Sequence, residues 1–105
     1  MSQMSEIRRA HLEEAEKNPN LERNIVYVLA VVRENEGVFD RFGLIRETRL
    51  KHNPDFSLDA FEADAAINVA EHRGLIQTRS RPYSGHDMSV YILSEEERRR
   101  LFRNQ

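Results

Sequence analysis

The 105-residue sequence contains no cysteine, and this absence excludes several kinds of chemistry together. Without thiols the chain can form no disulfide, no thiolate metal site and no cysteine nucleophile. The four histidines are spread over positions 11, 52, 72 and 86, so no pair has the spacing of a zinc site. The four glycines form no phosphate-binding loop. We therefore expect neither a metal nor a cofactor.

Long apolar runs are also absent. The longest covers residues 25–32, eight residues where a membrane-spanning helix needs about twenty. The first residues lack the apolar segment of a secretory signal. We therefore expect a cytoplasmic protein with no membrane partner.

No convergent set of catalytic residues is evident in the sequence. The segment Ser84-Gly-His-Asp87 contains the residue types of a hydrolytic triad, but neighbours in a turn cannot hold the triad geometry. The glutamates at 13, 14 and 95–97 fall at helix starts or on exposed faces, where helix propensity explains them. We expect a protein that is not an enzyme.

Neither sign of charge dominates, since 16 Lys and Arg stand against 18 Asp and Glu, a formal net charge of -2. This balance excludes a protein that coats nucleic acid by bulk positive charge. The charge is nevertheless divided unevenly. Residues 57–74 carry four carboxylates and one arginine, whereas residues 37–56, 75–93 and 94–105 each have one excess positive charge. The length suits one domain over residues 1–105.

Apolar residues at helical spacing predict an N-terminal helix over residues 4–17 and a second helix after it. Asn18 is the expected cap of the second helix, Pro19 its first residue, and Gly37 its end. The β-branched residues 25–32 would also suit a buried strand. The charged residues on both sides continue the helical pattern, so length favours a helix.

Two shorter helices are predicted next, with a tight turn between them. Asp40 opens the first, and Pro54 ends it because the residue before a proline is pushed out of the helical region. Ser57 is the expected cap of the other, which stops at Gly74. Two helices joined by a short turn form a helix-turn-helix.

After Gly74 the hydrophobic period changes from that of a helix to that of a strand. We expect short strands over 75–79 and 89–93, separated by a long hairpin tip over 80–88. The capping box Ser94-Glu-Glu-Glu97 then begins a last helix over 94–105. The predicted fold class is mainly α with a small β-hairpin, an α+β fold.

Three motifs follow one another along the chain: Ala70-Glu-His-Arg-Gly-Leu-Ile76, Arg79-Ser-Arg-Pro82 and Val90-Tyr-Ile-Leu-Ser-Glu95. In this order they resemble the end of the recognition helix, the wing and the following strand of winged helix-turn-helix transcription regulators of the MarR-like and PadR-like kind. The resemblance covers roughly residues 21–100. It implies a winged-helix core over 19–93 with extra N- and C-terminal helices, a recognition helix in the major groove, and a wing near phosphates or the minor groove.

This resemblance predicts a small homodimeric transcription regulator that binds double-stranded DNA. The expected base contacts come from the helix over 57–74, and the expected affinity comes from the wing and from the basic face of the preceding helix. The alternative interpretations are that the wing is an ordinary solvated hairpin and that the basic helix face is a charged surface in contact with solvent. The predicted DNA-binding residues are Arg46, Arg49, Lys51, Ser57, Glu62, Asn68, Arg79, Arg81, Tyr83, Ser84 and His86.

The acidic character of residues 57–74 supports a second hypothesis. The motif at Gly74 sets a register that turns Ala63, Ala66, Ile67 and Ala70 toward the core. The outer side then resembles a protein-contact face, through which an adaptor or antagonist would dock on a basic partner. The residues of this alternative face are Asp59, Phe61, Glu62, Asp64, Ala65 and Val69.

The terminal helices carry more apolar residues than a minimal winged helix buries. Within one chain these residues would form a small satellite cluster, and between two chains they would form an isologous interface. We expect the homodimer. The predicted dimer residues are Met4, Ile7, Leu12, Leu101 and Phe102.

Overall fold

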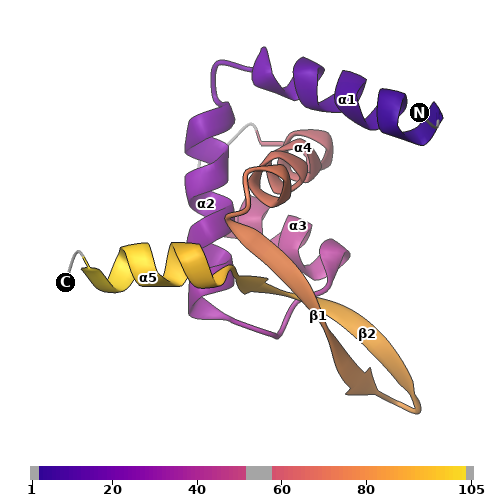
Figure 1. The fold of residues 1–105 in the computed structure, drawn as a ribbon, viewed down its shortest axis with the longest axis vertical. Helices are drawn as coiled ribbons and strands as arrows, with labels where there is room; N and C mark the ends of the chain where they lie inside the picture. Colours follow the sequence, from indigo (N-terminus) through magenta and orange to yellow (C-terminus); the bar gives the residue numbers. More distant parts are fainter. Residues whose placement is uncertain (1–2, 52–57, 104–105) are drawn as a thin grey trace.

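The computed structural model describes residues 3–51 and 58–103, with residues 3–5 and 102 described by their backbone only. The described chain is mainly helical with one antiparallel hairpin, which confirms the predicted α+β class (Figure 1). In chain order the elements are α1 (Gln3–Glu16), α2 (Leu21–Glu34), α3 (Arg41–Lys51), α4 (Ala60–His72), β1 (Ile76–Tyr83), β2 (His86–Leu93) and α5 (Glu95–Arg103).

Helix α2 lies at the centre of the core and packs against α3, α4 and β2. Its β-branched run forms a helix, as length predicts, and Val28 and Val32 are almost fully buried. The four α4 residues predicted to face the core, Ala63, Ala66, Ile67 and Ala70, are all fully buried, which confirms the predicted register, and Val69 is buried with them. Three of these four residues are alanines, whose small side chains let two helices approach closely.

The predicted start of α2 is wrong by two residues. The helix begins at Leu21 and not at Pro19, and Asn20 occupies the cap position without a side-chain cap. The Asn18 Oδ1 instead accepts a hydrogen bond from the Asn20 backbone N–H at 2.9 Å, forming a turn before the helix. The predicted opening of α3 is confirmed, because the Asp40 carboxylate accepts the Gly43 N–H at 2.8 Å.

The cap of α4 is Asp59, whose Oδ1 accepts the Glu62 N–H at 2.8 Å. The prediction of Ser57 as the cap is therefore wrong, and Ser57 itself lies outside the described residues. The helix stops as predicted before Gly74, whose φ of 72° is accessible to glycine at little cost.

The hairpin is longer and tighter than predicted. The strands pair continuously from Ile76 opposite Leu93 to Tyr83 opposite His86, so the predicted loop over 80–88 is wrong. A two-residue turn of Ser84 and Gly85 joins them, with φ of 48° and 83°. Positive φ at both central residues is the requirement of a type I′ turn, whose twist matches that of the strands.

The loop between α2 and α3 fixes the base of the hairpin. Both backbone groups of Tyr91 are used, because its carbonyl accepts the Gly37 N–H at 3.0 Å and its N–H donates to the Phe39 carbonyl at 2.9 Å. At the end of β2, the Ser94 Oγ accepts the Glu97 N–H at 3.1 Å, which confirms the predicted cap of α5. The outer half of the hairpin projects beyond the helices (Figure 1).

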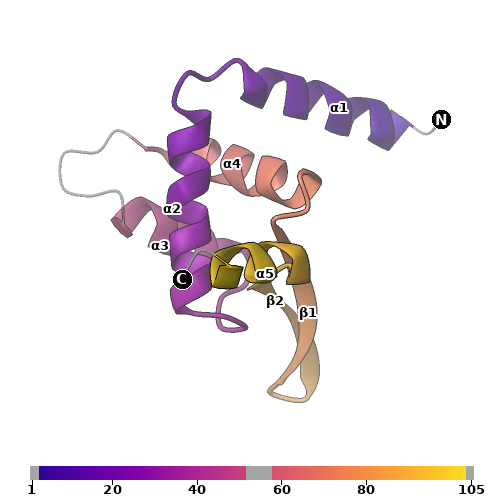
Figure 2. The ribbon, with the colours of Figure 1, turned by 60° about the vertical axis from the view of Figure 1, so that its left-hand side comes forward.

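The two terminal helices lie at opposite ends of α2 (Figure 2). The residues predicted for one dimer surface are therefore divided: Leu12 and Leu101 each pack partly against the core, and Ile7 is 48% exposed. The side chains of Met4 and Phe102 lie outside the described part. Within residues 3–51 and 58–103, every helix is too short or too polar to cross a membrane.

Candidate nucleic-acid interface

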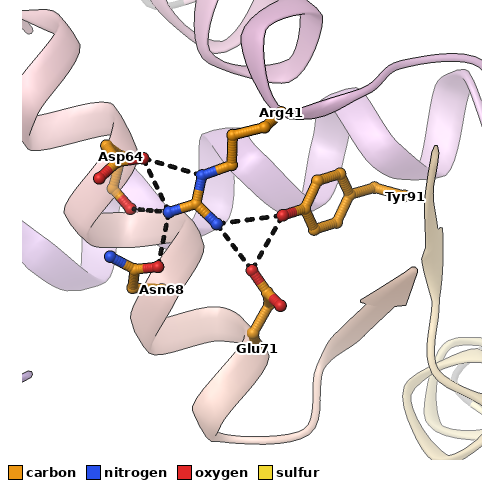
Figure 3. Close-up of polar contacts among 5 residues, drawn as sticks. All are labelled: Arg41, Asp64, Asn68, Glu71 and Tyr91. Atoms are coloured by element: carbon orange, nitrogen blue, oxygen red, sulfur yellow. Dashed lines mark hydrogen bonds and ion pairs between the residues drawn. The ribbon is translucent and has the colours of Figure 1, made fainter. Parts of the chain in front are cut away.

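Arg41, the first residue of α3, links three elements (Figure 3). Its Nε donates to the Asp64 Oδ1 at 2.8 Å, and its Nη2 donates to the Asn68 Oδ1 at 2.5 Å. Its Nη1 donates to the Glu71 Oε1 at 2.8 Å and to the Tyr91 hydroxyl at 3.0 Å. The Tyr91 hydroxyl in turn donates to Glu71 at 2.9 Å. One guanidinium therefore joins α3 to one side of α4 and to β2.

Burial and pairing fix the charges of this cluster. Burial alone would lower the pKa of Arg41, but hydrogen bonds with Tyr91 and Asp64 raise that pKa above its ordinary value. Burial raises the pKa of the Tyr91 phenol, and the opposing hydrogen bond from Arg41 does not cancel this effect. At neutral pH the cluster therefore holds a charged guanidinium and a neutral phenol.

Val69 was predicted on the outer side of α4, and this prediction is wrong, because its side chain is 1% exposed. Helix α1 packs against α4, and Val69 belongs to the same core cluster as Ala15 of α1. The core therefore extends around α4 to a position that the pattern of α4 alone assigns to solvent.

The rest of the predicted protein-contact face is also divided. Asp64 is held by Arg41, Glu62 accepts a hydrogen bond from the Asn18 side chain at 3.2 Å, and Ala65 is half-buried against the core. Phe61 is 86% exposed, as predicted. The side of α4 opposite its buried face is thus a narrow strip, the outward strip, consisting of Phe61, Ala65, Asn68 and His72.

The predicted wing residues lie along the hairpin, with Arg79 and Arg81 within β1 and Tyr83, Ser84 and His86 at the hairpin tip. Arg79 and Arg81 share one face of β1, and in the described part of the chain neither is paired with a carboxylate. The Arg81 Nη1 donates to the Gly37 carbonyl at 2.8 Å. Tyr83 is exposed and its ring meets that of His86 edge-on at 6.2 Å. Ser84 forms the turn.

Arg46 is the α3 residue that joins this group. It lines a groove of about 550 Å³ between the start of α3 and the hairpin, together with Tyr83, Met88 and Phe42. Its side chain is 68% exposed and its ion pair with Glu47 is long, at 3.4 Å. The guanidinium of Arg46 is therefore accessible beside the hairpin.

Two more of the predicted DNA-binding residues, Arg49 and Lys51, bond to other parts of the chain. The Arg49 Nε donates to the Leu58 carbonyl at 3.2 Å, and the Lys51 Nζ donates to Glu34 at 2.7 Å. Both bonds hold the end of α3 to neighbouring segments. Ser57 lies outside the described residues.

The structure has a groove between α1 and α4 that the sequence pattern did not predict. It has a volume of about 400 Å³ and is lined by Ile7, Arg8, His11, Leu12, Arg41, Asn68 and Glu71. Arg8 and His11 lie one helical turn apart, beside the apolar stripe of α1, and this spacing is the signal that could have identified them.

No group of metal-ligating side chains is found among residues 3–51 and 58–103. Comparison of the chain with protein-family models, with curated proteins and with solved structures gave no match.

Proposed function

We propose that this protein is a winged-helix DNA-binding protein that acts as a homodimeric transcription regulator. The hairpin serves as the wing, and the outward strip of α4 faces the major groove. The observation that carries the proposal is the pair of accessible arginines, Arg79 and Arg81, on a projecting hairpin that follows helices α3 and α4.

The arrangement of the elements supports this proposal. The order α2, α3, α4, β1, β2 is the order that the resemblance to winged helices implies. In Figures 1 and 2, α1 and the hairpin lie on opposite sides of α4 and extend away from α2. A duplex approaching from that side would meet the outward strip of α4 between two projecting arms.

The hairpin arginines are suited to phosphate contact. A guanidinium has five N–H donors, and the Arg81 bond to the Gly37 carbonyl uses one of them. This bond orients the side chain before DNA arrives, which reduces the entropy lost on binding. Each phosphate neutralised contributes about 0.9 to the slope of log affinity against log salt.

The carboxylates of α4 oppose DNA binding less than their number in the sequence suggests. Asp64 and Glu71 share the guanidinium of Arg41, and Asp59 is used as the helix cap. Asn68 has its oxygen engaged by Arg41, so the side-chain NH₂ is the group left for DNA. An NH₂ donor can contact acceptors on base edges in the major groove or a phosphate oxygen.

A selection from random duplex DNA at two salt concentrations tests the function. We expect a pseudo-palindrome with half-sites about one helical turn apart, and a protein mass twice that of the chain. Retention of no DNA at the lower salt concentration would contradict the proposal.

A protein partner is the second candidate function, because two aromatic side chains are largely exposed. Phe61 is 86% exposed and Phe42 is 81% exposed, and large apolar groups in contact with water often mark interaction sites. Under this candidate the protein is an adaptor or antagonist. Phe61→Ser would then abolish a stoichiometric complex with a purified partner and leave the melting temperature unchanged.

A further inference from the structure

We propose that α1 provides a second phosphate site, in which Arg8 and His11 of α1 and Asn68 of α4 bind a backbone phosphate of duplex DNA. The site is the groove between α1 and α4. This inference rests on the proposed function and extends the DNA interface to a helix outside the winged-helix core.

Arg8 supplies the positive charge of the site. Its side chain is exposed, and no hydrogen bond or ion pair joins it to another residue within 3–51 or 58–103. His11 is exposed one turn further along the same helix and lines the same groove. An arginine with all its donors free can bind a phosphate through two parallel hydrogen bonds.

Asn68 supplies a donor whose direction is fixed. Because its Oδ1 accepts from Arg41, its NH₂ group points away from the Arg41 cluster (Figure 3). This NH₂ has no hydrogen bond to the described residues. The carboxylate that lines the groove, Glu71, is paired with Arg41 at 2.8 Å, which reduces its repulsion of an anion. The Arg8 guanidinium and the Asn68 NH₂ are thus donors available in this groove, and a phosphate oxygen accepts from donors.

The position of α1 makes this site geometrically suitable for a duplex. Arg73 forms ion pairs with Glu16 at 3.2 Å and with Glu22 at 2.8 Å, and these pairs hold α1 to α2 and α4. A helix in the major groove, which is about 12 Å wide, has a phosphate backbone on each side. The hairpin lies on one side of α4 and α1 on the other (Figures 1 and 2). The hairpin would contact one backbone and Arg8 the other.

Arg8→Gln tests the charge, with Arg23→Gln as the matched control, since Arg23 is an exposed arginine of α2. We expect Arg8→Gln to weaken binding of a selected duplex about 3- to 10-fold at low salt and to reduce the salt slope by about 0.9, the value for one phosphate. Arg23→Gln should change neither quantity. Equal effects of the two substitutions would overturn the site.

Asn68→Asp tests the donor, because aspartate keeps an acceptor for Arg41 but replaces the NH₂ with a negative oxygen. Asn20→Asp makes the same change at an exposed position in the turn before α2. We expect Asn68→Asp to melt near the wild-type temperature and to bind DNA at least 10-fold more weakly, with Asn20→Asp close to wild type. Wild-type affinity of Asn68→Asp would overturn the site.

The outcomes separate this inference from the function on which it rests. If hairpin substitutions abolish DNA binding and Arg8→Gln has no effect, the second site is wrong and the function stands. If the wild-type protein binds no duplex, the function fails first. Inorganic phosphate is the remaining probe: if it shifts the NMR signals of His11 and Asn68 while Arg8→Gln leaves DNA binding unchanged, the groove binds a free phosphate and the DNA assignment is overturned.

Discussion

The arginine at the start of α3 and the two arginines of the hairpin differ in what surrounds them. Arg41 is partly buried and bonds to three residues of α4 and one of β2. Arg79 and Arg81 lie on an exposed strand, and among the described residues the one side-chain hydrogen bond of this pair is that from Arg81 to the Gly37 carbonyl. Arg41 is a structural residue because it pairs with partly buried carboxylates. Arg79 and Arg81 pair with no carboxylate among the described residues, so their guanidinium groups are free to bind an external anion.

The largest expected effect is the loss of Arg41. In Arg41→Leu, Asp64 and Glu71 would remain partly buried without a counter-charge, and we expect the free energy of unfolding in urea to fall by about 2–4 kcal/mol, since removing one partner of a buried ion pair is strongly destabilising. Arg79→Leu should change it by less than about 0.5 kcal/mol, as usual for surface substitutions. Similar losses in the two variants would remove the distinction between the two regions.

The next largest expected effect is a loss of DNA affinity when the hairpin arginines are replaced. We expect Arg79→Gln with Arg81→Gln to reduce affinity for a selected duplex about 10- to 100-fold at low salt and to lower the salt slope by about two phosphate contacts. Fluorescence anisotropy at several salt concentrations measures both. The matched control is Arg99→Gln with Arg103→Gln, which removes two charges from α5. An unchanged salt slope in the hairpin variant would show that the wing assignment is wrong.

A smaller effect concerns buried polar groups that have no partner, in contrast to the Arg41 cluster. The Thr48 hydroxyl is buried on α3 and bonds to none of the described residues. Valine has nearly the same shape without the hydroxyl, so Thr48→Val should raise the free energy of unfolding by about 1 kcal/mol, the low end of the cost of an unsatisfied buried group. Thr48→Ser keeps the hydroxyl and loses a methyl group, and it should destabilise. A less stable Thr48→Val would mean that the hydroxyl has a function in the fold.

The sequence predicted the elements of the fold better than the residues of the site. The motif at Gly74 set the register that identified the core face of α4, where Ala63, Ala66, Ile67 and Ala70 recur at helical spacing and are buried. The cap of α4 was assigned to Ser57 and not to Asp59, since both residue types cap helices and local sequence does not choose between them.

The hairpin and the site depend on contacts that local sequence does not contain. The long loop predicted over 80–88 is instead paired strand, since proline is tolerated in an edge strand at Pro82 and the Ser84-Gly85 pair makes a tight turn. The partners of Arg41 lie 23 to 50 residues away along the chain. Val69 is buried in a core cluster that also contains Ala15 of α1, which lies 54 residues earlier in the chain. These long-range contacts decide which charged residues remain free.

The smallest expected effect is at Arg73. This arginine is exposed like those of the hairpin, but it has carboxylate partners like Arg41. The hydrogen bond from Arg73 lowers the pKa of the Glu22 carboxyl below its ordinary value of 4.5. A carboxyl whose pKa is lower in the folded state stabilises the fold above its ordinary pKa, and this stabilisation is lost as the pH falls through the lowered pKa. Arg73→Gln should therefore have a lower urea midpoint than wild type at pH 7, and the difference should shrink toward pH 3. Because the pair is exposed, salt should also reduce the difference. A difference that stays constant from pH 7 to pH 3 would mean that Arg73 holds α1 through packing of its aliphatic stem and not through its charge.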